Sequence, residues 1–124
     1  MKRDMDLARG LLLAIEDAPG TELRDQPNIP GFSEEQVTYH LGLLKEAGLI
    51  DATMVSSKTD LCFIGISMTW SGHEFLDKVR DPEIWSTAKD GAKRVGSWSI
   101  GLLADLAKAA VMAKAHSLGL PVGG

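Results

Sequence analysis

The sequence has one cysteine, Cys62, among 124 residues, so no disulfide can form within the chain. It also lacks an N-terminal apolar stretch of the kind found in secretory signals, because four of its first six residues, MKRDMD, are charged. No uncharged apolar run approaches the roughly 20 residues that a membrane span needs. These absences predict a cytoplasmic protein with no membrane partner.

Groups of catalytic or metal-binding side chains are also missing. The three histidines, His40, His73 and His116, are far apart, and none has the spacing of an H-x-x-H or C-x-x-C site. Apart from the final Gly123-Gly124, the glycines stand singly, and no glycine-rich phosphate loop is present. We therefore expect no enzymatic activity, no catalytic residue, no metal and no cofactor, and we interpret His40 as a hydrogen-bonded structural residue.

The composition, with 44% apolar and 24% charged residues, suits one hydrophobic core. Asp4 is a suitable cap for a first helix, whose apolar residues recur at helical spacing until Pro19-Gly20. Ser33 and Gln36 fit a capping box that opens a second helix, and Gly48 suits its end. The proline-rich stretch 25–31 between the two helices leaves no room for another helix.

A hairpin and further helices follow in the pattern. An extended stretch to about Val55, a polar turn over 56–60 and a β-rich segment over 61–68 predict two strands, the second with apolar residues on both faces and thus covered on both sides. Thr69 is expected to cap a third helix. Asp81-Pro82 predicts the start of a fourth helix, which Gly96 interrupts. Residues 99–116 predict the last helix, and residues 118–124 a frayed tail. Core packing is the expected role of all three tryptophans.

Two segments resemble parts of bacterial winged-helix regulators. Residues 33–50, SEEQVTYHLGLLKEAGLI, resemble their recognition helix and first wing strand, which read S-x-x-x-V-x-x-H-L-x-x-L-x-x-A-G-L-I. Residues 68–76, MTWSGHEFL, resemble the L-T-x-x-G-x-x-x-L pattern that closes the wing. With the N-terminal MKRDMDL and residues 80–85, the whole chain resembles a family of small bacterial and prophage proteins of unknown function.

The resemblance implies an α+β fold: a winged-helix-like domain (helix, recognition-type helix, two-stranded wing) with additional C-terminal helices. We assign residues 1–82 to that domain and residues 83–124 to a helical extension that packs on the core or on a partner subunit. Charge is uneven along this chain. Residues 33–82 hold four bases and eight acids, whereas residues 83–124 hold five bases and three acids. The part that resembles a nucleic-acid reader is therefore the acidic part.

Two functions stay open from the sequence. The first is double-stranded DNA binding or regulation, for which the exposed contacts would be Thr38, Tyr39, Lys45 and Lys58; neighbouring glutamates and the missing positioning helix disfavour it. The alternative is a non-enzymatic protein-interaction module, for instance a mobile-element accessory protein or an inhibitor that binds a host or phage protein. A homodimer is expected, with candidate interface residues Trp85, Trp98, Leu103, Leu106 and Ala110, although the last helix could instead fold back on the first.

Overall fold

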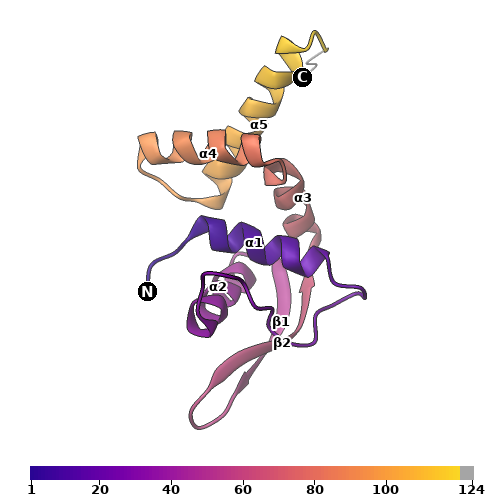
Figure 1. Cartoon of the computed structure of the whole chain (residues 1–124), viewed down its shortest axis with the longest axis vertical. Helices are drawn as coiled ribbons and strands as arrows, with labels where there is room; N and C mark the ends of the chain where they lie inside the picture. The colour runs from indigo at the N-terminus through magenta and orange to yellow at the C-terminus, as the bar shows by residue number, and fades with distance from the viewer. Residues whose placement is uncertain (121–124) are drawn as a thin grey trace. The chain divides into compact units, whose positions relative to one another are not determined.

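The computed structural model describes residues 1–120 and divides into two compact units, Met1–Leu76 and the chain from Asp77 onward. The first unit holds α1 (Met5–Glu16), α2 (Glu34–Glu46), β1 (Ile50–Ser56), β2 (Leu61–Met68) and the start of α3 (Trp70–Val79) (Figure 1). The second holds the end of α3, α4 (Pro82–Val95) and α5 (Ile100–Ser117). The α+β class is confirmed: two helices, an antiparallel hairpin, then three helices. The units divide inside α3, whereas the sequence placed a boundary after residue 82.

The two N-terminal helices begin where side-chain chemistry predicts. The Asp4 carboxylate accepts hydrogen bonds from the N–H groups of Asp6 and Leu7, at 2.9 and 3.2 Å. At α2, the Ser33 N–H donates to Oε1 of Gln36, and the Gln36 N–H donates to Oγ of Ser33, which completes the capping box. The segment between α1 and α2 contains no helix, as the sequence predicted.

The hairpin is irregular near its base. The register changes between Asp51 and Thr53 of β1, opposite Gly65 of β2, which has a φ of 58°. This bulge interrupts the alternation of side chains, and both Phe63 and Ile66 are buried although they are three residues apart. An extended segment at Leu23 pairs with Ile66 at the same place.

The prediction that β2 is covered on both sides is wrong. Leu61 is 47% exposed and Ile64 is 39% exposed, whereas Phe63 and Ile66 are buried. Leu61 shares a face with Phe63 but lies nearer the turn, where that face is no longer covered, and Ile64 lies on the other face, which is open. Continuous apolar runs are typical of strands buried on both sides, but here the hairpin extends beyond the core (Figure 1).

α3 is fixed to the junction between α2 and β1 by Thr69 and Gly72. The Thr69 hydroxyl donates to the Gly48 carbonyl at 2.6 Å, and the Thr69 N–H donates to the Leu49 carbonyl at 3.0 Å. The Gly72 N–H in turn donates to the Thr69 hydroxyl. Any Cβ on Gly72 would collide with the Leu49 carbonyl oxygen. The T-x-x-G pattern therefore reflects a close backbone approach.

The second unit follows the predicted caps. The Asp81 carboxylate accepts from the N–H groups of Glu83 and Ile84, α4 ends at Gly96 with a φ of 79°, and Ser99 caps α5. Within residues 1–120, no helix has both the length and the apolar character that crossing a membrane requires. The tail predicted over 118–124 lies in part, at 121–124, outside the described residues.

Candidate functional site

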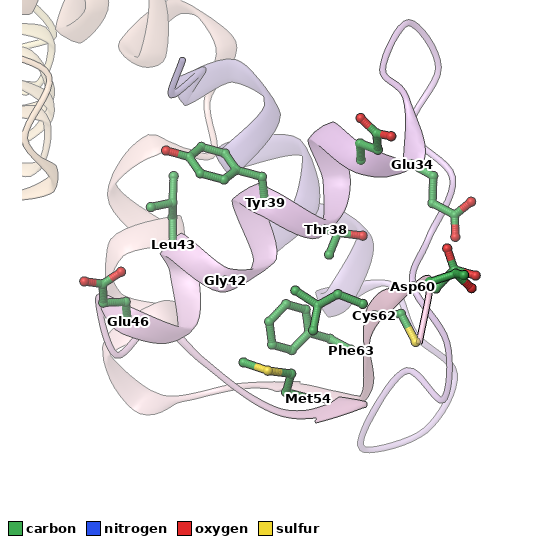
Figure 2. A pocket seen from close by; sticks show the side chains of 13 residues that line it. Glu34, Thr38, Tyr39, Gly42, Leu43, Glu46, Met54, Asp60, Cys62 and Phe63 are labelled. Carbon is green, nitrogen blue, oxygen red and sulfur yellow. The ribbon is translucent and has the colours of Figure 1, made fainter. Parts of the chain in front are cut away.

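An open groove of about 780 Å³ lies between α2 and the hairpin (Figure 2). α2 contributes one wall, and β1, the turn and β2 contribute the other. Thirteen residues line the groove: Glu34, Glu35, Thr38, Tyr39, Gly42, Leu43, Glu46, Met54, Thr59, Asp60, Leu61, Cys62 and Phe63. The groove therefore overlaps the face of α2 that the sequence predicted to be exposed, with Thr38 and Tyr39 in its lining and Lys45 outside it.

The floor of the groove is apolar. Met54 and Phe63 are cross-strand partners, so their side chains share one face of the hairpin. A Cβ on Gly42 would lie 3.7 Å from the Phe63 ring, which shows how closely α2 approaches β2 at this point (Figure 2). Met54 is 57% exposed. An apolar surface in a concave site is available here to a ligand.

The two walls are joined by Gln26, which lies in the irregular segment between α1 and α2. Its side-chain N–H donates to the Thr38 hydroxyl at 2.8 Å, and its Oε1 accepts from the Phe63 N–H at 2.7 Å. Sequence reasoning missed this residue, because nothing local distinguishes a bracing glutamine from a solvated one. The only sign of its role in the sequence is that Gln26 lies in a proline-rich segment, which cannot form a helix and whose backbone groups therefore lack helical hydrogen bonds.

The rim of the groove is acidic. Glu34, Glu35, Glu46 and Asp60 line it, and no lysine, arginine or histidine is among the lining residues. Within residues 1–120, none of these four carboxylates takes part in a side-chain hydrogen bond or an ion pair. The negative potential of a cleft lined by one sign of charge repels anions and attracts cations.

The residues proposed to contact DNA fall in different places. Thr38 and Tyr39 line the groove, and the Thr38 hydroxyl accepts the bond from Gln26. Lys45 and Lys58 are exposed but outside the lining, with Lys45 Nζ 6.0 Å from the centroid of the Phe63 ring. The structure therefore brings together the two neutral candidates and not the two cationic ones. Their contacts with DNA stay predictions.

The candidate interface residues lie mostly inside the helical unit. Trp85 and Leu103 are buried, and Ala110 is partly exposed. Leu106 packs against Gly91 of α4, where an added Cβ would lie 3.1 Å from it. Trp98 is exposed. A role of these five residues in self-association stays a prediction. Trp98 is the most accessible of the five.

The interpretation of His40 as a structural histidine is confirmed. The side chain is 2% exposed, and both ring nitrogens have partners in the first unit. The expected core role is confirmed for Trp85, which is buried, and wrong for Trp98 and Trp70, which are exposed. Trp70 is 80% exposed, and its indole N–H donates to Glu74 one turn later. Within residues 1–120, no group of three or more His, Cys, Asp or Glu side chains is arranged to hold a metal.

These features describe an α+β chain whose first unit carries an amphipathic, acidic groove. The chain belongs to the DUF2513 family, whose model, described as a hypothetical protein, matches residues 2–98. It is 43% identical over 96 residues to an uncharacterized protein of Haemophilus influenzae, a match that covers 75% of this chain and 80% of the relative. No solved structure gives a significant match. The family model thus spans α1 to α4 and ends before α5.

Proposed function

We propose that this protein is a non-enzymatic regulatory module of winged-helix type that binds a partner protein through the groove between α2 and the hairpin. The observation that carries the proposal is the lining of the groove, which combines an apolar floor with four carboxylates and has no basic residue. Exposed apolar patches rimmed by polar residues are typical of protein-binding surfaces.

The order of the elements supports the winged-helix part of the proposal. α2 stands where a recognition helix would, directly before the hairpin that corresponds to the wing. A single β-bridge between Leu23 and Ile66 joins the segment before α2 to the free edge of that two-stranded hairpin. The positioning helix of a DNA-binding helix–turn–helix is replaced by an irregular segment, and Gln26 braces α2 in its place.

Binding of double-stranded DNA is the second candidate, and Tyr39, Lys45 and Lys58 favour it because all three are exposed on α2 or at the hairpin tip. Phosphate contacts supply most of the non-specific affinity for a duplex. Four carboxylates in the groove oppose such contacts. We therefore rank a protein partner above DNA.

Site-specific photocrosslinking in the organism of origin tests the proposal. A photoreactive phenylalanine replaces Met54, whose side chain faces the groove, or Val55, whose side chain alternates to the other face of β1. We expect a protein adduct from position 54 that is absent from position 55 and is lost in a Glu35→Lys variant.

Titration with a mixed-sequence duplex at low and moderate salt tests the alternative, that the chain binds DNA. Binding that tightens at low salt and is lost on Lys45→Ala, together with no protein adduct at position 54, would overturn the proposal in favour of DNA. Absence of duplex binding at low salt together with the position-specific adduct supports it.

A further inference from the structure

We infer that the groove accepts a basic, amphipathic segment of the partner chain, whose apolar side chains lie on the floor and whose lysines or arginines reach the acidic rim. This inference rests on the proposed function and specifies the chemistry of the partner. It follows from where the apolar side chains and the carboxylates lie along the groove.

The floor supplies the apolar contacts. Met54 and Leu61 leave about half of their surface exposed on either side of buried Phe63, and Leu43 adds apolar surface from α2. Figure 2 shows Met54 and Phe63 on the hairpin side of the groove, below the α2 residues Thr38 and Gly42. Gly42 packs over the Phe63 ring, which is 3% exposed, so the apolar surface that a partner can reach comes from Met54, Leu61 and Leu43. Such a floor selects apolar side chains on one face of the partner.

The carboxylates of the rim lie at the two ends of the groove. Glu34 and Asp60 lie at one end of the groove and Glu46 at the other (Figure 2). Glu35 and Glu46 are 11 residues apart on α2, which corresponds to about 16 Å along the helix axis. Basic side chains of the partner should therefore stand about 11 residues apart in a helical segment, or about five in an extended one.

The first end is the more acidic, with Glu34, Glu35 and Asp60 against Glu46 alone. A partner segment should therefore carry more of its positive charge at one end, which would fix its direction in the groove. Charge complementarity of this kind sets orientation and association rate more than affinity. It also disfavours the alternative ligands with phosphate groups.

The test measures fluorescence anisotropy of labelled synthetic peptides against the 124-residue chain. The first peptide is an amphipathic lysine–leucine helix with two lysines at one end and one lysine 11 residues away. The second has glutamate at the same three positions, and the third is a scrambled version of the first. We expect the first peptide to bind at least about tenfold more tightly than the other two, with affinity that falls as salt rises.

Matched protein variants locate the binding. A Glu35→Gln/Glu46→Gln double variant should lose about fivefold or more in affinity, whereas Asp51→Asn, a carboxylate outside the lining, should not change it. Met54→Ser should weaken binding and Val55→Ser should not, because the two side chains lie on opposite faces of β1. Each substituted residue is exposed, so each variant is expected to fold, which circular dichroism verifies.

Four outcomes would overturn the inference. Equal binding of the amphipathic and scrambled peptides would show that charge alone is recognised. Equal losses in the groove variants and in Asp51→Asn would place binding elsewhere. Dimerisation of the chain that is lost in the Glu35→Gln/Glu46→Gln variant would assign the groove to a second copy. If the crosslinked protein at position 54 is still found but the first peptide does not bind, only this inference is overturned. If the chain binds duplex DNA and no protein is crosslinked at position 54, the proposed function itself is overturned.

Discussion

The imidazole of His40 accepts a hydrogen bond at Nε2 from the backbone N–H of Asp4, with 2.7 Å between the nitrogen atoms. The other ring nitrogen, Nδ1, donates to the Gln36 carbonyl at 2.8 Å, so the ring carries its proton on Nδ1. Asp4 is the residue that caps α1. One buried side chain on α2 thus fixes the start of α1 from 36 residues away.

We expect His40→Ala to lower the free energy of unfolding by about 2–3 kcal/mol, because it leaves a cavity and removes the partner of the Asp4 N–H. Urea unfolding followed by circular dichroism measures the change. His73→Ala, at an exposed position on α3, is the control and should stay within about 0.5 kcal/mol of the parent protein. An equal effect of the two substitutions would contradict the structural role of His40.

Gly72→Ala should destabilise the protein by about 2 kcal/mol or more, since the added methyl group meets a backbone carbonyl that has little freedom to move. Gly10→Ala is the matched control. Gly10 lies inside α1 with no atom within 4 Å of an added Cβ, so this change should stabilise the protein by about 1 kcal/mol. Thermal unfolding of both variants shows the sign of each effect. A Gly72→Ala protein as stable as the parent would disprove the close approach of α3.

The Gln26 brace predicts coupling between two distant positions. Gln26→Ala should cost about 1–2 kcal/mol of unfolding free energy, because the Phe63 N–H and the Thr38 hydroxyl both lose a partner. A double-mutant cycle with Thr38→Val should give an interaction energy of about 1 kcal/mol. Asn28→Ala, an exposed change in the same segment, is the reference. Strict additivity of the Gln26 and Thr38 substitutions would show that the bond does not contribute.

Self-association through α5 is predicted from its exposed apolar residues, among which Val111 is 46% exposed and Met112 is also accessible. We expect the 124-residue chain to sediment as a dimer and Val111→Asp to shift it to a monomer, because a charge in an apolar interface is costly to desolvate. Ala109→Asp, on the opposite side of the helix, should leave the dimer intact. A monomeric parent protein, or a dimer that tolerates Val111→Asp, would rule out this interface.

The ends of the helices were predictable because they depend on chemistry within a few residues. The caps at Asp4, Ser33 and Asp81 and the turns at Gly48 and Gly96 all lie where sequence patterns indicated. The exposed face of α2 was predictable for the same reason, since a helix of known period has one buried stripe.

The bulge in β2 was not predictable, since it arises from pairing with both β1 and the Leu23 segment. Without it, alternation alone would place Phe63 and Ile66 on opposite faces. The groove was missed for a related reason: its second wall is formed by residues that follow α2 in sequence but return beside it only once the hairpin closes. The requirement for glycine at position 72 was also unpredictable, because it comes from close contact with Leu49, and no local pattern reveals such a contact.

The Gln26 amide sets the distance between the two walls of the groove, while Gln26 itself lies outside the lining. Under the proposed function, the shape of the partner-binding surface would therefore depend partly on the linker that precedes α2. Relatives with the same lining but a shorter or differently kinked linker should hold the walls at another spacing and select other partners. Specificity in this architecture can thus diverge through a segment that never touches the ligand.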